Sequence, residues 1–324
     1  MKQYKIIFSS ICILLFNLNA YCQQQGQYSQ YMMNYFLINP AVAGTEDYLE
    51  IKCGFRKQWT GISDAPQNYY VTASMPLNKI NRKMAQGKQN KNHHSVGFMA
   101  TGQTLGILAH NIALINYAYH LSVSKNSVLA FGVDAGANHM WADNSKAKWG
   151  DNIPDYESIY NVNKLNFDLG LGLWFYNKKL FCGVSTKQTP ESSFDNGFDR
   201  LLNVHVYATG GYKLALNQDW TYIPSLLFKG TSNAYQVDVN NKFKFDNRMW
   251  FGMSYRHTDA VAALAGVSFP VGKTKKANTA IVEIGYSYDY TLSKLNIASY
   301  GSHEIMIGLL LPKAGKMVCA DEFW

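Results

Sequence analysis

The residue types that usually carry chemistry are present in this sequence, but their spacing matches no catalytic motif. It contains no GxSxG, HExxH, Walker or EF-hand pattern. Gly170 and Gly172 resemble part of the GxGxxG fingerprint, but they lie inside an alternating apolar stretch that opens no helix. Asp151, Asp155 and Glu157 could hold calcium, although they fit no ligand spacing and a solvated loop is the simpler interpretation.

The histidines and cysteines show no grouping that would bind a metal or attack a substrate. His93 and His94 lie in a basic stretch, while the neighbours His303 and Glu304 point to opposite faces of an expected strand. Three cysteines beyond the first residues are widely spaced and form no CxxC, namely Cys53, Cys182 and Cys319. The sequence therefore predicts a protein that is not an enzyme and that has no cofactor and no metal site.

Residues 164–176, KLNFDLGLGLWFY, indicate which kind of element would position a functional side chain. Apolar side chains occupy every second position, which is typical of a β-strand with one apolar face. A soluble sheet could also bury such a face, so only repetition along the chain favours a membrane barrel. A barrel strand needs about nine to eleven residues, a length that this stretch reaches.

The alternating pattern recurs in about fourteen stretches, an even number that bacterial barrels require. They cover residues 49–56, 69–77, 95–102, 111–123, 128–141, 164–176, 180–186, 203–216, 220–229, 235–245, 249–256, 261–269, 280–290 and 303–311. Their ionisable residues share the polar parity, namely Asp134, Asp168, Lys213, Asp238, Lys242, Lys244, Arg256, Glu283 and Asp289. A basic residue on the lipid face near the midplane costs about 2–4 kcal/mol. We therefore expect an all-β transmembrane antiparallel barrel with a polar interior over residues 47–312.

Connection lengths assign the two ends of this barrel. Short connections fall on one side, which fits periplasmic turns, at residues 124–127, 177–179, 217–219 and 246–247. Long connections fall on the other side, where surface loops belong, at residues 143–163, 187–202 and 291–302. Two basic turns on the short side are longer, at residues 78–94 and 271–278. They are either solvated loops or a docking site for an acidic periplasmic or cell-wall partner.

The first residues and the composition indicate export. Lys2 and Lys5 precede an apolar run that is too short for a membrane-spanning helix, so we interpret residues 1–22 as a cleaved signal peptide. Removing these two lysines lowers the formal charge from +8 to +6, and an exported chain has no nucleic-acid partner. A charged fraction of 16% lies below the soluble average of about 25%. The 22 Tyr, 17 Phe and 7 Trp suit the aromatic girdles of a barrel.

Residues 23–46 do not alternate and form a separate segment. Ser29 could cap a short helix, and Pro40 would stop it at Asn39. Four apolar residues would share one face of this helix, namely Met32, Met33, Phe36 and Leu37. We expect the segment to plug or close the barrel on its periplasmic side, or to bind a partner. Residues 313–324 would form a periplasmic tail.

Five blocks of sequence resemble the PorP/SprF family. They are YSQYMMNYFLINPAVAGT from Tyr28, FRKQWTGISDAPQNYYVTASMPL from Phe55, NYAYHL from Asn116, SYRHTDA from Ser254 and GYSYDYTLSKLNIASYGSHEIMIG from Gly285. The resemblance implies an outer-membrane barrel of the type IX secretion system. SprF-like members are implied to support secretion and surface attachment of large proteins with a type B C-terminal domain, such as gliding adhesins; PorP-like members belong to the machinery itself. The ending CADEFW departs from the expected Cys-Pro-basic-Phe ending.

The expected partners are the secreted adhesin, type IX secretion components and outer-membrane lipid. We predict that partner contacts use aromatic and polar residues of three regions. In the N-terminal segment these are Tyr28, Tyr31, Asn34 and Asn39, at the first rim Arg56, Gln58 and Trp59, and in the outer loops Trp149, Tyr156, Phe194 and Phe198. Loops carry recognition on a rigid barrel. The alternative is an outer-membrane solute transporter or porin. An open porin has no need of an amphipathic plug, but a gated transporter could have one.

Overall fold

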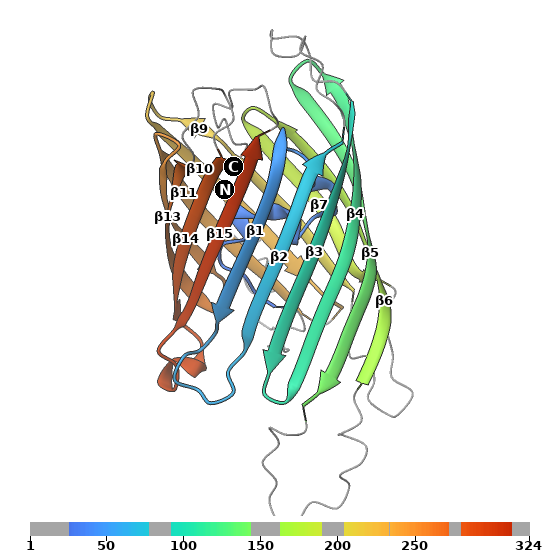
Figure 1. Cartoon of the computed structure of the whole chain (residues 1–324). Coiled ribbons are helices and arrows are strands. Elements are labelled where there is room, and N and C mark those ends of the chain that lie inside the picture. The colour runs from blue at the N-terminus through green and yellow to red at the C-terminus, as the bar shows by residue number, and fades with distance from the viewer. Residues whose placement is uncertain are drawn as a thin grey trace, which may run out of the picture.

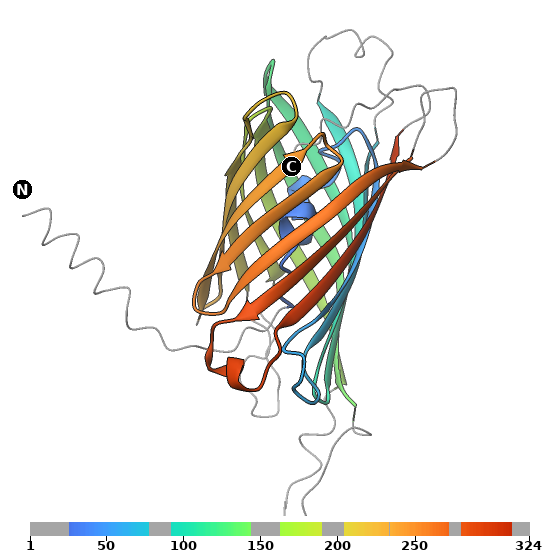
Figure 2. The same cartoon turned by 90° about the vertical axis from the view of Figure 1, so that its left-hand side faces the viewer.

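The computed structural model shows a closed β-barrel with a short segment inside it (Figures 1 and 2). It describes residues 26–77, 92–143, 163–189, 204–232, 234–271 and 280–312. Among these residues, no helix is long and apolar enough to cross a membrane.

The strands follow one another along the chain in meander order. They are β1 (Tyr48–Lys57), β2 (Gln67–Pro76), β3 (His93–Leu105), β4 (Leu108–Ser124), β5 (Ser127–Ala142), β6 (Asn163–Asn177), β7 (Leu180–Thr189), β8 (His205–Tyr212), β9 (Leu214–Ala215), β10 (Trp220–Gly230), β11 (Tyr235–Phe245), β12 (Met249–Arg256), β13 (Ala260–Val271), β14 (Ala280–Thr291) and β15 (Ser302–Pro312). All pairings are antiparallel, and β15 pairs with β1 to close the ring.

The strands β8 and β9 form one course that is interrupted at Lys213, since both pair with β10. Over the described residues the barrel therefore has 14 strand positions, which confirms the expected fold class. We call the end that holds Tyr48 and Pro312 the terminal end, and the end that holds Lys57 and Ser302 the loop end. In Figure 1 the terminal end lies at the top.

The strands at the loop end are longer than the alternation predicted. β3 and β4 continue to a two-residue turn at Gly106 and Ile107, where an eight-residue connection was expected between residues 102 and 111. Outside the hydrocarbon layer the outward side chains need not be apolar, so the hydrogen-bonded ladder extends beyond the alternating pattern.

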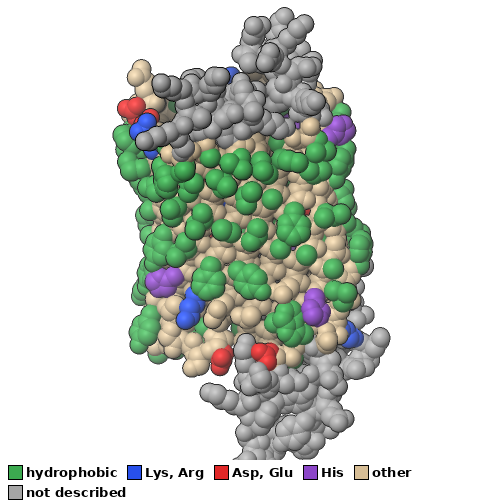
Figure 3. All heavy atoms as spheres, viewed as in Figure 1, with side chains coloured by type: hydrophobic (Ala, Val, Ile, Leu, Met, Phe, Trp, Pro, Cys, Tyr) green, Lys and Arg blue, Asp and Glu red, His purple; other side chains and the backbone are tan. Residues whose placement is uncertain are grey.

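The two faces of the wall have opposite chemistry. Figure 3 shows apolar side chains over the middle of the outer surface, with charged side chains near the two ends. Outward residues such as Leu165 and Ile115 are 72% and 69% exposed, whereas inward Asp134 and Asp238 are 0% exposed. Of the ionisable residues expected inside, all but Lys213 are buried. The alternation therefore identified the lipid and lumen faces correctly.

The inner segment contains three one-turn 3₁₀ helices, η1 (Tyr31–Met33), η2 (Tyr35–Leu37) and η3 (Pro40–Val42). We call residues 26–46 the plug, and every residue from 29 to 46 is buried. Figure 2 shows it inside the ring of strands.

The single capped helix expected here was wrong. Gln30 precedes η1 without a side-chain cap, and Pro40 opens η3 with Asn39 as its N-cap. The physical reason is that side chains of the wall donate hydrogen bonds to plug carbonyl groups, which in a longer helix would accept from backbone N–H groups. Ser185 donates to the carbonyl of Ile38 at 2.5 Å.

Candidate functional site

The plug runs through the lumen from one end of the barrel to the other. At the loop end the Tyr28 ring packs edge-on against Tyr70 at 5.0 Å between centroids. At the terminal end the carbonyl of Ala43 accepts a hydrogen bond from Ser95 Oγ at 2.6 Å. We expected the segment to plug or close the barrel on its periplasmic side, and in the structure it contacts the wall from the loop end to the terminal end.

Glycines in the wall make room for the backbone of the plug. A Cβ atom on Gly132 would lie 2.3 Å from the backbone nitrogen of Ala41. One on Gly172 would lie 2.1 Å from Asn39 Oδ1. Both distances are far below van der Waals contact, so only glycine permits this close approach. The wall of β5 and β6 is therefore shaped to hold η3.

Apolar side chains of the plug pack against an apolar part of the wall. The Tyr35 ring lies 5.5 Å from the Trp174 ring and 5.2 Å from the Phe181 ring. The larger buried apolar residues of the plug are Tyr31, Met32, Met33, Tyr35, Phe36, Leu37, Ile38 and Val42. Each such side chain contributes about 1.5–3 kcal/mol when buried. Even with allowance for a compact unfolded chain, the plug is held by on the order of 10 kcal/mol.

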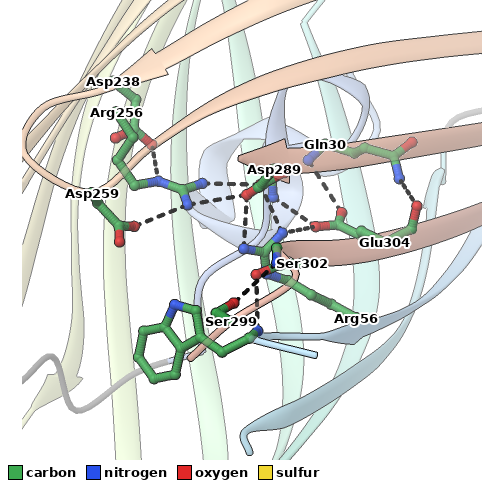
Figure 4. A network of polar contacts seen from close by, with 12 residues as sticks. Gln30, Arg56, Asp238, Arg256, Asp259, Asp289, Ser299, Ser302 and Glu304 are labelled. Atoms are coloured by element: carbon green, nitrogen blue, oxygen red, sulfur yellow. Dashed lines mark hydrogen bonds and ion pairs between the residues drawn. The ribbon is translucent and has the colours of Figure 1, made fainter. Parts of the chain in front are cut away.

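Five ionisable side chains meet in the lumen near the loop end, and we call them the charge cluster. They are Arg56 of β1, Asp238 of β11, Arg256 of β12, Asp289 of β14 and Glu304 of β15, and all are buried. Arg56 lies 2.8 Å from Asp289 and 3.4 Å from Glu304, measured between nitrogen and oxygen atoms. Arg256 lies 3.4 Å from Asp289 and 3.6 Å from Asp238. Figure 4 shows these side chains converging from separate strands.

The charge cluster holds the start of the plug. Glu304 accepts hydrogen bonds from the backbone N–H groups of Ser29 at 2.7 Å and Gln30 at 3.1 Å. The Ser29 hydroxyl accepts from Arg56 at 2.8 Å and from Arg256 at 3.1 Å, and it donates to Asp289. We expected Ser29 to cap a helix, but its hydroxyl is bonded to side chains of the wall instead.

Polar side chains hold the middle of the plug. Asn39 Nδ2 donates to the carbonyl of Leu173 at 2.9 Å, while its Oδ1 accepts from the N–H of Ala41 at 2.9 Å. Asn116 donates to the carbonyl of Pro40 at 3.1 Å. Lys52 also contacts the carbonyl of Met33. Contacts with carbonyl groups satisfy the backbone of a segment that forms no long helix.

A small cavity remains beside the plug and reaches toward the loop end. Its volume is about 60 Å³, and its lining includes Tyr28, Tyr31, Ile38, Met99, Tyr207 and Lys229. A single water needs about 10–15 Å³ by the same measure, so the cavity has room for a few water molecules. Among the described residues, no three His, Cys, Asp or Glu side chains gather as a metal ion would require.

Beyond the charge cluster, at the loop end, two connections are hydrogen-bonded to each other, and we call residues 59–60 and 300–302 the rim. Thr60 donates its N–H to the carbonyl of Gly301 at 2.8 Å, and Tyr300 donates its N–H to the carbonyl of Thr60 at 2.6 Å. The N–H of Trp59 donates to Ser302 Oγ at 3.1 Å. Trp59 has a φ of 44°, a conformation that costs a non-glycine residue about 1–3 kcal/mol and often marks a functional position.

The structure separates the expected contact residues into two groups. Tyr28 and Trp59 are half-buried near the loop end. The others that the structure describes are buried, namely Tyr31, Asn34, Asn39, Arg56 and Gln58. Trp149, Tyr156, Phe194 and Phe198 lie outside the described residues. Contact of any of these residues with a partner stays a prediction.

The alternating pattern placed Arg256 and Asp289 in the lumen, but it did not indicate that they meet Arg56. Glu304 was not among the residues expected in the lumen. A signal was available, because all four lie within the last or first three residues of strands at the loop end. Residues at the same depth on neighbouring strands of a barrel are brought together by the ladder. Asp238, on β11, completes the cluster from the next strand.

Several solved structures are similar to this chain over most of its length. The CymD monoaromatic hydrocarbon channel has 8% identity and a TM-score of 0.51, over 89% of this chain and 93% of that chain. A Pseudomonas aeruginosa FadL homologue has 10% identity and a TM-score of 0.47, over 84% and 92%. The Pseudomonas putida toluene transporter TodX has 8% identity and a TM-score of 0.43, over 86% and 92%. At such identities the likeness to CymD shows the fold alone.

The sequence itself carries the assignment to a family. No curated protein matches it. The family described as type IX secretion system membrane protein PorP/SprF matches residues 20–309, which include the whole plug and nearly the whole barrel. This match confirms the resemblance found in the five sequence blocks. The chain therefore belongs to the PorP/SprF family of type IX secretion system membrane proteins.

Proposed function

We propose that this protein is a non-enzymatic outer-membrane barrel that supports secretion and surface anchoring of large proteins with a type B C-terminal domain, such as gliding adhesins. The carrying observation is the plug, which is buried from residue 29 to 46 and tied to the wall along its length. A barrel whose lumen is filled in this way suits a receptor or anchor. Its family membership supports a role beside type IX secretion components.

The alternative is a solute transporter, which the cavity at the loop end favours. A passage would require the plug to leave its site. The apolar burial alone opposes this by on the order of 10 kcal/mol, and the hydrogen bonds of the charge cluster add to it. We therefore rank the anchor above the transporter.

In this proposal the loop end faces the outside and the terminal end faces the periplasm, as short turns do in bacterial barrels. Partner contact would involve Trp59 and the rim, together with the outer loops at residues 143–163 and 187–202. The buried residues Arg56 and Gln58 would act by positioning the rim. The basic turns at residues 78–94 and 271–278 would meet a periplasmic or cell-wall partner.

Two measurements on the full-length protein test the proposal. Deletion of residues 192–199 should leave the barrel in the outer membrane but remove the secreted protein from the cell surface. As a matched control, Lys178→Ser in a terminal-end turn should retain it, because that turn is at the other end of the barrel. If the deletion variant keeps its secreted protein at the normal level, the outer-loop contact is wrong.

Purified wild-type barrel in a planar bilayer should conduct no better than protein-free bilayer. Steady conductance from the wild-type protein, without copurification of a large secreted protein, would favour the transporter.

A further inference from the structure

The connection between β14 and β15 lies at the loop end of the barrel (Figure 1), where two of its residues are bonded to outward tyrosines of β14. Tyr288 Oη donates to the carbonyl of Tyr300 at 3.0 Å, and Asn296 Nδ2 donates to Tyr290 Oη at 3.2 Å. Tyr288 and Tyr290 point outward, because Asp289 between them is buried in the lumen. The connection therefore lies against the face of β14 that carries apolar and aromatic residues.

This connection presents apolar side chains to its surroundings. It contains the 3₁₀ helix η6 (Lys294–Ile297), and we call residues 292–300 the foot. Ile297 is 96% exposed and Tyr300 is 79% exposed, while Leu292 and Leu295 are 47% and 40% exposed. Figure 1 shows η6 beside the loop ends of β14 and β15.

The foot is held in place by both neighbouring connections. Leu292 donates its N–H to the carbonyl of Asp259 at 2.7 Å, and Tyr300 is bonded to Thr60 in the rim. The Tyr300 ring also covers Gly61, where an added Cβ would lie 2.6 Å from a ring carbon. Its exposed apolar residues are therefore carried by an anchored backbone, and exposed apolar patches mark sites of protein or membrane interaction.

The exposed face of the foot continues an interface that the fold already has. On the adjoining strands, outward Tyr255, Tyr286 and Tyr290 are 45%, 44% and 50% exposed, and outward Ile305 is 50% exposed. Aromatic residues at this level form the girdle that barrels place at the boundary between headgroups and acyl chains. The apolar surface extends from this girdle onto the foot.

We propose that the foot binds the membrane leaflet that adjoins the loop end, with Ile297 inserted at the boundary of headgroups and acyl chains. Lys294 is exposed on the same short helix, where a cation suits lipid phosphate groups. A secreted protein is the less favoured occupant, since it would have to reach past the rim onto the lipid-facing side. This inference does not depend on the proposed role in secretion.

The test uses a fluorophore attached at single cysteines in the full-length protein, in a background where all five native cysteines are replaced by alanine. The protein is reconstituted into phospholipid vesicles that contain nitroxide-labelled lipid. Ile297→Cys should carry a label with blue-shifted emission that the lipid nitroxide quenches. Ser63→Cys, exposed on the neighbouring connection, should carry a label that iodide in the water quenches instead.

Both labelled variants must run as heat-modifiable barrels, which shows that they are folded. The proposal is overturned if the label at position 297 is quenched by iodide and not by lipid nitroxide. It is equally overturned if that label becomes protected only when the secreted protein is added, because the foot is then a protein-binding surface.

Discussion

At the scale of single residues, the charge cluster links the wall of the lumen to the plug. Buried charges lose several kcal/mol of hydration each, and they persist only when partners satisfy them. Here Arg56 forms ion pairs with Asp289 and Glu304. Glu304 also accepts hydrogen bonds from two backbone N–H groups of the plug. The cluster thus joins the wall to the plug. Removal of one member would leave the buried charges of its partners without an ion pair.

Arg56→Ala should therefore destabilise the barrel by about 3–5 kcal/mol, the usual effect of breaking a buried ion pair. The matched control is Arg248→Ala. Its partner Asp246 lies at 3.4 Å, but the two side chains are 73% and 58% exposed, and such pairs contribute about 1 kcal/mol or less. The measurement is the temperature at which the compact band is lost in unboiled samples. Equal midpoints for the two variants would show that the cluster adds no stability.

At the scale of elements, the plug and the β5 wall are matched backbone to backbone. Gly132 faces the chain at Pro40 and Ala41, where an added methyl group would lie within 2.5 Å of three backbone atoms. These atoms belong to η3, which its Asn39 cap and Asn116 also hold. The clash cannot be relieved by a side-chain rotation, so the whole turn must move.

Gly132→Ala should therefore loosen η3 and cost about 1–3 kcal/mol, as overpacking of a closed site does. Gly210→Ala is the control, because a methyl group there would meet its nearest atoms at 3.6 Å, an ordinary contact. Hydrogen exchange in the peptide that covers residues 38–45 should rise in the first variant alone. Unchanged exchange in Gly132→Ala would mean that the wall yields in place of the plug.

At the scale of the whole molecule, the ring of strands separates a lipid-facing surface from a polar and plugged interior. The outer surface is apolar over its middle (Figure 3), and each of the 14 strand positions among the described residues pairs on both sides, with β8 and β9 counted as one. A sheet edge would leave amide groups unsatisfied in hydrocarbon, so closure and insertion depend on each other. The mature chain should accordingly be found in the outer-membrane fraction and should migrate faster unheated than boiled.

Substitutions on the two faces of β6 should differ in their effect on assembly. Leu171 faces outward and is 55% exposed, so Leu171→Arg should lower barrel yield through a penalty of about 2–4 kcal/mol near the midplane. Asn166→Arg, on the lumen face of the same strand, should assemble more completely. The measurement is the heat-modifiable fraction in the outer membrane. Equal yields would contradict the lipid contact of Leu171.

The sequence by itself determined the strands, their faces and the family. Successive side chains of a strand point to opposite faces, and the side chains that face lipid must be apolar. A period of two in the sequence therefore predicts which face of a strand contacts lipid. It therefore predicted that Asp168 lies inside and Leu171 outside, and five sequence blocks pointed to the family. These properties depend on residues that are close together in the sequence, so they can be predicted without the tertiary contacts.

Only the tertiary structure decided which residues meet across the lumen. Ser29 has the sequence context of a helix cap, but Arg56, Arg256 and Asp289 engage its hydroxyl from three separate strands. The foot was expected only as part of a long surface connection, and the structure shows that Tyr288 and Tyr290 of β14 bond to it. The contacts of Ser29 with Asp289 and Arg256 join residues more than 200 positions apart on the chain, and they exist because closure of the ring fixes the register of every strand against the plug.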